Sequence, residues 1–340
     1  MAKNIVVFSD GTGQAGGEGN NTNIYKMFNM LEDRTRRQVV FYDPGLGTNW
    51  QKITGNIGGC GISENIQQCY RFIFEQYEAG DQIFLFGFSR GAATVRSLSS
   101  FIHYFGLLPQ SRPDLISKAY DIYKITDDAE RHKQANEFLL RHHNMWVSIR
   151  FLGCYDTVAA LGLPLKGLNA LIEGIPGLQH KFHNFDLSES VENACQALAI
   201  DEERQVFRPV LWNKKIRDYQ TLQQVWFCGM HSDVGGGYPV QTLSDIPLVW
   251  MTRMGMEHGL LLYSGHKVKI AEDANGLMHD SRGEPATKLF RREVRRWDKG
   301  RGKPVVHQSV LDRAGNPANN YHPWILSGGY DVEPWVHGLG

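Results

Sequence analysis

Short apolar runs recur along this sequence and are separated by polar segments. Each run has five to seven residues, is almost continuously apolar and is rich in Ile, Val and Phe; the runs cover residues 4–8, 38–42, 82–88, 148–154 and 224–230. Such a run is typical of a strand that is buried on both faces of a parallel sheet. The pattern therefore predicts five buried strands.

Helical patterns lie between these runs. Residues 63–80 carry their apolar side chains on one stripe, with Ser63 as the expected N-cap and Gly80 as the stop. A second stripe predicts a long helix over residues 187–212. Because strands alternate with helices and crossovers between parallel strands are right-handed, we expect an α/β fold. Its central sheet would be mostly parallel, with helices on both faces.

Two inserted segments and a C-terminal region complete the expected layout of a single domain over residues 1–340. Residues 105–147 form a mostly polar helical insertion, which would cap the site or add a structural pair of helices. Residues 157–185 are apolar and are interrupted by Gly and Pro, so we expect a lid or pocket wall. Residues 260–340 would wrap the domain surface. Their basic cluster at 288–304 is expected to be a solvated helix face.

Composition excludes several classes of protein. The 36 basic and 36 acidic residues give a formal net charge of zero, which argues against a nucleic-acid partner and a strongly basic membrane patch. The N-terminal apolar stretch is too short for a signal peptide, and no window reaches the roughly 18 apolar residues of a spanning helix. The five cysteines are scattered and lack zinc-ligand spacing, so we expect buried free thiols and a soluble protein made in the cytoplasm.

Reactive side chains follow directly after three of the predicted strands. Ser89 follows the third strand within Gly-Phe-Ser-Arg-Gly, Asp156 follows the fourth strand, and His231 follows the fifth. Because the carboxyl ends of parallel strands meet at one edge, these side chains are expected to meet there. Their chain order is that of α/β-hydrolases, which carry the nucleophile on a Gly-x-Ser-x-Gly turn between strand and helix. The sequence therefore predicts Ser89 as nucleophile, His231 as base and Asp156 as acid.

Acyl transfer also needs hydrogen-bond donors for the oxyanion. The backbone N–H of Arg90 would supply one donor, and the glycine-rich loop after the first strand, with Gly11 and Thr12, would supply the other. An alternative triad remains open, in which His307 replaces His231 as the base and Asp233 is its acid partner. No metal site is evident, and no cofactor is expected.

Six stretches resemble one known family. In order along the chain they are VVFSDGTGQ, NNTNIYKM, GFSRGAATVRSL, FLGCYDTVAALG, HNFDLSESVENACQALAIDEERQVFRPVLW and VWFCGMHSDVGGGYP. Together they resemble domain of unknown function family 2235, an uncharacterised α/β-hydrolase family that includes type VI secretion phospholipase effectors. The resemblance implies a serine hydrolase of carboxylic esters, with phospholipase A activity and export by a specialised secretion system in the secreted members. It places the nucleophile on Ser89, the acid on Asp156 and the base on His231.

Three functions compete at this point. The first is a serine esterase, lipase or phospholipase that forms an acyl-enzyme, takes an ester or lipid substrate and touches a membrane surface transiently. The second is a catalytically inactive hydrolase fold that serves as a binding or adaptor protein, because a fold alone does not guarantee chemistry. The third is a phosphotransferase, suggested by Asp10 in the sequence FSDGTG. Those enzymes carry an Asp-x-Asp pair, however, and Phe8 stands at the position of the first aspartate.

Overall fold

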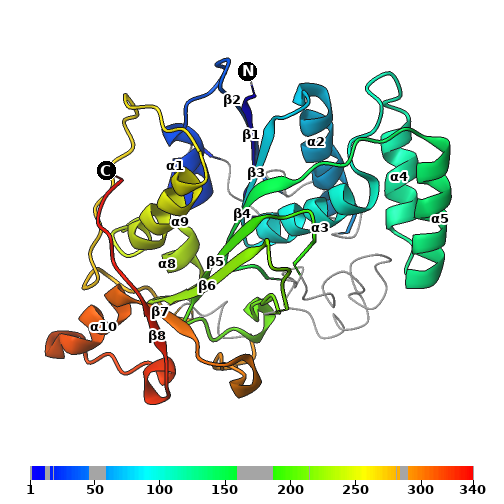
Figure 1. Ribbon diagram of the computed structural model, residues 1–340. Coiled ribbons are helices and arrows are strands. Elements are labelled where there is room, and N and C mark those ends of the chain that lie inside the picture. Colours follow the sequence, from blue (N-terminus) through cyan, green and yellow to red (C-terminus); the bar gives the residue numbers. More distant parts are fainter. Residues whose placement is uncertain are drawn as a thin grey trace.

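The fold is built on one sheet of parallel strands (Figure 1). The computed structural model describes residues 2–11, 16–17, 19–45, 59–158, 187–213, 215–280, 282–283 and 290–339. Within these residues the sheet has eight strands in the order β2-β1-β3-β4-β5-β6-β7-β8, and every neighbouring pair is parallel. The strands are β1 (Asn4–Ser9), β2 (Gln38–Asp43), β3 (Gln82–Phe88), β4 (Ile149–Tyr155), β5 (Asn193–Ala199), β6 (Thr221–Phe227), β7 (Val305–His307) and β8 (Asp331–Glu333).

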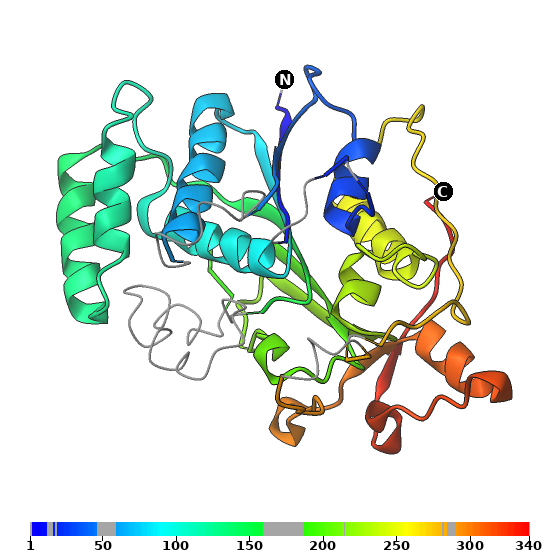
Figure 2. The ribbon, with the colours of Figure 1, turned by 180° about the vertical axis from the view of Figure 1, so that it is seen from behind.

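Helices cover both faces of the sheet. Successive side chains of a strand point to opposite faces, and both faces carry apolar side chains that have to be buried. In β1, Ile5 and Val7 join the core on the side of α2 and α3, whereas Val6 and Phe8 join the core on the side of α1 and α9. Figures 1 and 2 show the two layers of helices on either side of the sheet. The predicted α/β-hydrolase architecture is therefore confirmed. The helices are α1 (Asn23–Met30), α2 (Gly59–Gln76), α3 (Arg90–Phe105), α4 (Leu115–Tyr123), α5 (Asp128–Arg141), α8 (His231–Gly235), α9 (Asp245–Glu257) and α10 (Gln308–Gly315), with short 3-10 turns η2 (Gln205–Phe207), η4 (Lys299–Arg301), η5 (Pro317–Asn319) and η6 (Trp324–Ser327).

All five predicted strands are present, with ends shifted by at most three residues. The helix that we expected around residues 63–80 is α2, which begins four residues before Ser63. The long helix expected over residues 187–212 is wrong, since this segment instead contains β5 and η2. Strand β5 lies between β4 and β6 in the middle of the sheet, and all seven of its residues are buried.

The error has a physical cause in the polar residues of β5. Asn193 and Gln196 interrupt the small apolar residues and make the segment look like an amphipathic helix. In the folded chain, however, Asn193 donates its side-chain amide to the carbonyl of Arg150, and Gln196 donates to the carbonyl of Val210. Buried polar groups are tolerated when they are hydrogen-bonded. These long-range partners allow a strand with polar side chains to lie inside the core.

The three segments around the sheet differ in how the structure treats them. Within 105–147, α4 and α5 lie outside α2 and α3, and the Tyr123 hydroxyl of α4 donates to the carbonyl of Ser97. The apolar segment 157–185 lies outside the described residues except for its first two positions. Residues 260–340 contribute β7, β8 and α10, so this region extends the sheet in addition to covering it.

The expected buried thiols are confirmed for the four cysteines whose side chains are described, Cys69, Cys154, Cys195 and Cys228. Burial raises the pKa of each of these thiols, so they are held in the neutral form. Across the part of the chain that the structure describes, no helix has both the length and the apolar character needed to cross a membrane.

Candidate active site

The direction in which the chain progresses across the sheet reverses at β1. Strand β1 lies between β2 and β3, so the chain leaves β1 in one direction along the sheet and later returns to its other side. Ligands of open parallel sheets bind beyond the carboxyl ends of the strands at such a reversal. Ser9, the last residue of β1, is paired with Gly87 of β3. The loop after β1 and the turn after β3 therefore lie next to each other.

Ser89 occupies a strained turn between β3 and α3. Its backbone has φ 58° and ψ −117°, a conformation that residues other than glycine rarely adopt. The Ser89 N–H donates to the carbonyl of Tyr155 at 3.0 Å, which ties the turn to β4. Glycine is required on both sides: a Cβ on Gly91 would lie 2.0 Å from the Ser9 carbonyl oxygen, and a Cβ on Gly87 would lie 2.5 Å from that of Gly91. This is the geometry of a nucleophile elbow.

Two of the three residues expected to form the oxyanion hole lie within the described part of the chain. Arg90 is the first residue of α3, where a backbone N–H has no partner within the helix. Gly11 lies beside the elbow, since a Cβ built on it would be 3.7 Å from Ser89 Cβ. Its N–H, however, donates to the Asp10 carboxylate at 2.6 Å and is therefore occupied in this conformation. Thr12 lies outside the described residues.

His231 and Asp156 form a buried pair. The Nδ1–H of His231 donates to Asp156 Oδ2 at 2.6 Å, and the two residues are 4% and 0% exposed. The other ring nitrogen, Nε2, is buried and has no hydrogen-bond partner among the described residues. The ring of Phe88, the residue directly before Ser89, lies against the His231 ring with centroids 4.6 Å apart. The structure thus pairs His231 with Asp156 and packs the residue before Ser89 against the His231 ring, while no hydrogen bond joins Ser89 to His231 in this conformation.

Arg295 is the component of this site that the sequence did not reveal. It belongs to the basic cluster at 288–304, yet its side chain is 3% exposed and donates to both Asp156 oxygens, at 2.6 Å and 2.8 Å. Burial by itself would raise the pKa of Asp156, but the charge of Arg295 and the hydrogen bonds from Arg295 and His231 outweigh burial and hold this pKa well below its usual range. The expectation of a solvated face is wrong for Arg295, because a buried carboxylate requires a charged partner.

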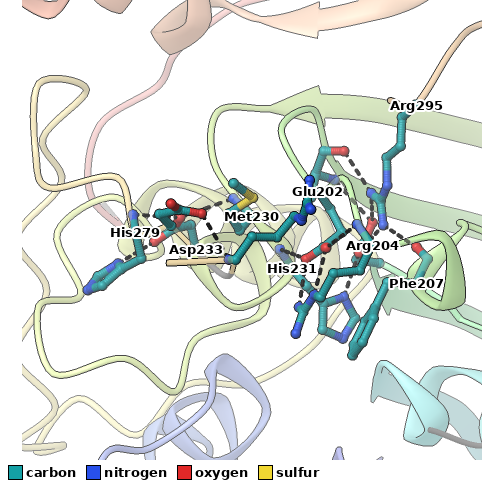
Figure 3. Close-up of polar contacts among 12 residues, drawn as sticks. Glu202, Arg204, Phe207, Met230, His231, Asp233, His279 and Arg295 are labelled. Atoms are coloured by element: carbon teal, nitrogen blue, oxygen red, sulfur yellow. Dashed lines mark hydrogen bonds and ion pairs between the residues drawn. The ribbon is translucent and has the colours of Figure 1, made fainter. Parts of the chain in front are cut away.

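One wall beside His231 is formed by the segment that follows β5 (Figure 3). Glu202 is 1% exposed, accepts a hydrogen bond from the His231 backbone N–H at 3.3 Å, and is paired with Arg204 at 2.7 Å. The Arg204 guanidinium lies 3.8 Å above the ring of Phe207, and that ring meets the His231 ring with centroids 4.8 Å apart. These side chains enclose the imidazole and restrict its orientation.

The two members of the alternative triad are engaged elsewhere. Asp233 accepts a hydrogen bond from the His279 ring at 2.7 Å and another from the Met230 N–H at 3.0 Å. His307, at the end of β7, has its Nδ1 2.9 Å from the Ser309 hydroxyl, and burial lowers its pKa to about 3. No hydrogen bond or ion pair joins Asp233 to His307. His279, the actual partner of Asp233, was not anticipated, because no strand-end pattern marks it.

Comparison with known proteins places the chain in a family. The family model for "T6SS, Phospholipase effector Tle1-like, catalytic domain" matches residues 3–254. An uncharacterized protein of Saccharomyces cerevisiae is 28% identical over 319 residues, which cover 85% of this chain and 44% of the yeast protein.

Two solved structures are also similar. A crystal structure of an uncharacterized protein from Pseudomonas aeruginosa has 17% identity and a TM-score of 0.46, covering 77% of this chain and 46% of that chain. The Tle1 effector bound to the VgrG spike of the type 6 secretion system has 20% identity and a TM-score of 0.43, covering 71% of this chain and 52% of that chain. The chain thus spans about half the length of these three proteins.

Proposed function

This chain belongs to the family of Tle1-like phospholipase effector catalytic domains, and on that premise we propose that it is a serine hydrolase that cleaves carboxylic esters of lipids. The observation that carries the proposal is the buried His231–Asp156 pair beside the strained Ser89, with Nε2 of His231 unpartnered among the described residues. Burying a polar pair and straining the backbone of a neighbouring serine both cost free energy. The combination has a direct use in nucleophilic catalysis.

The proposed reaction has two halves. Ser89 Oγ attacks the ester carbonyl while His231 Nε2 takes its proton, and the Asp156 carboxylate holds the ring and stabilises the imidazolium. The backbone N–H of Arg90 donates to the oxyanion that forms. When the tetrahedral intermediate collapses, the C–O bond to the alcohol breaks and His231 returns the proton to the leaving oxygen. Water then attacks the acyl-enzyme with the same base, which releases the fatty acid and restores Ser89.

The proposed substrate is a glycerophospholipid, and the proposed activity is that of a phospholipase A at a membrane surface. This step rests on the name of the family, whose model covers residues 3–254. A neutral lipid or a short-chain ester would require the same three side chains. Substrate identity therefore has to be measured separately from the mechanism.

The test combines a covalent probe with lipid hydrolysis. Purified wild type, Ser89→Ala and His231→Ala are treated with a fluorophosphonate probe, which labels only an activated serine, and then with phosphatidylcholine and phosphatidylethanolamine vesicles. Released fatty acid and lysolipid are quantified by mass spectrometry. Ser117→Ala, on the exposed side of α4, is the matched control and should label and hydrolyse like wild type.

We expect both site variants to lose labelling and to lose hydrolysis by about 10³-fold or more. Equal labelling of Ser89→Ala and wild type would sink the nucleophile assignment. A wild type that is neither labelled nor active on lipids and p-nitrophenyl esters would instead identify an inactive, adaptor-like member of the fold.

A further inference from the structure

Arg295 reaches the site from outside the stretch that the family model covers. That stretch ends at residue 254, whereas Arg295 lies between α9 and η4, outside the helices and strands that the described residues form. It contacts Asp156, which is 139 positions earlier in the chain. The proposed catalytic site is thus completed by the C-terminal region of this chain.

The hydrogen bonds of Arg295 fix three parts of the site at once. Its Nη1 donates to Asp156 Oδ1 and to the carbonyl of Ala199 at 2.7 Å, and its Nη2 donates to Asp156 Oδ2 and to the carbonyl of Phe207 at 2.6 Å. Ala199 ends β5, and the Phe207 ring packs against His231. The planar guanidinium therefore sets the carboxylate and the neighbouring wall in one geometry.

Arg295 also shares the Asp156 carboxylate with His231. Oδ2 accepts from His231 Nδ1 at 2.6 Å and from Arg295 Nη2 at 2.8 Å, so a permanent cation and the imidazole face the same oxygen. In a triad the carboxylate stabilises the imidazolium. Here part of that negative charge is neutralised by Arg295, and formation of the imidazolium is correspondingly less favoured.

Two further carboxylates lie near His231, and each of them already has a partner. Glu202, which accepts from the His231 backbone N–H, is ion-paired with Arg204. Asp233, on the same helix as His231, is hydrogen-bonded to His279. Ser89 adds no charge on the side of β3. Asp156, paired with Arg295, is the carboxylate hydrogen-bonded to the His231 ring, whereas Glu202 stands beside the His231 backbone N–H and also interacts with His231 electrostatically.

We propose that Arg295 is a positioning residue, which holds the Asp156 carboxylate in place for His231 and whose charge offsets part of the charge of that carboxylate. The inference rests on the proposed serine-hydrolase function. It predicts two separable effects of replacing Arg295. Loss of its hydrogen-bond geometry should lower kcat, and loss of its charge should shift the acid limb of the pH profile. A residue that merely filled a buried space would not change the pH dependence of turnover when it is replaced.

The experiment is the pH profile of kcat/KM for p-nitrophenyl butyrate, from about pH 4.5 to about pH 9, for four variants besides wild type. Arg295→Met removes the charge, and Arg295→Lys keeps the charge but cannot donate in two parallel hydrogen bonds. Arg292→Met is the matched control, because Arg292 lies in the same segment, is exposed and is paired with Glu203. Ser89→Ala reports whether the activity depends on the proposed nucleophile, and circular dichroism confirms folding.

For Arg295→Met we expect the acid limb of the profile to move to higher pH by about 1–2 units, because the imidazolium is then favoured by an uncompensated carboxylate. For Arg295→Lys we expect an acid limb close to that of wild type with kcat lowered about 10-fold or more. Arg292→Met should leave both quantities unchanged.

Each contrary result has a distinct meaning. A folded Arg295→Met with an unmoved acid limb, or an Arg295→Lys with full kcat, would overturn the role of Arg295 while leaving the triad intact. Failure of both Arg295 variants to fold would also overturn it, since the residue would then be a requirement of folding. Full activity of Ser89→Ala would instead overturn the proposed function itself.

Discussion

The backbone strain at Ser89 can be measured by replacing this residue with glycine. Glycine has no Cβ and adopts φ 58° and ψ −117° without a clash, so Ser89→Gly should relieve strain of about 1–3 kcal/mol. Greater freedom of glycine in the unfolded chain costs about 0.5–1 kcal/mol of this gain. We therefore expect the free energy of unfolding to rise by about 1 kcal/mol. In a chain of this size the melting temperature should rise by about 1–2 °C, while hydrolysis is lost.

Ser89→Ala is the control that separates strain from chemistry. Alanine also lacks the hydroxyl but keeps the Cβ, so the strained conformation and the melting temperature should both stay close to those of wild type. Urea unfolding and thermal melts of the three proteins, at one pH and salt concentration, provide the comparison. A Ser89→Gly protein that is no more stable than Ser89→Ala would refute the claim that the elbow stores strain.

Three further predictions concern the surroundings of the site. Gly91→Ala should abolish hydrolysis and lower the melting temperature, because the new Cβ would lie 2.0 Å from the Ser9 carbonyl oxygen. His307→Ala should retain kcat/KM within about 3-fold of wild type while lowering stability by about 1–3 kcal/mol, whereas His231→Ala should lose activity; the opposite outcome would move the base to His307. Burial raises the pKa of Asp10 to about 6 in the folded chain, so the carboxyl binds more protons when folded and its contribution to stability is lost as pH rises from about 4 to about 6. Urea unfolding should therefore show Asp10→Asn gaining stability relative to wild type across that range, by up to about 3 kcal/mol, with a flat difference above it.

The strands and the strand-end residues could be predicted because their signals are local. A continuous apolar run indicates a buried strand. Because the strands pair in parallel, the residues that follow three of them, Ser89, Asp156 and His231, are placed at one edge of the sheet. The Gly-x-Ser-x-Gly pattern also indicates why Gly91 stands two residues after Ser89, since a sharp strand-to-helix turn leaves no room for a side chain at that position.

The remainder depends on partners that are distant in sequence. Strand β5 was mistaken for a helix because its polar residues find hydrogen bonds on other elements, as Gln196 does with the Val210 carbonyl. Arg295 could not be chosen in advance from the 36 basic residues of the chain, although a buried Asp156 calls for one such partner. Asp233 was considered only as the acid partner of His307, whereas the fold pairs it with His279.

Backbone strain identifies the same site by a route that does not use the motif. Among the described residues, four that are not glycine have positive φ: Arg34, Ser89, Asp156 and Asn320. Arg34 and Asn320 are exposed, where a turn can relax, whereas Ser89 and Asp156 are buried at the ends of neighbouring strands. Each buried residue is held by a hydrogen bond to the next strand, from the Ser89 N–H to the Tyr155 carbonyl and from the Asp156 N–H to the Ala197 carbonyl. Strain of this kind persists only where surrounding structure enforces it, and it gathers at functional sites. Its confinement to two adjacent strand ends, which carry a serine and the acid partner of a histidine, favours catalysis over a purely structural turn.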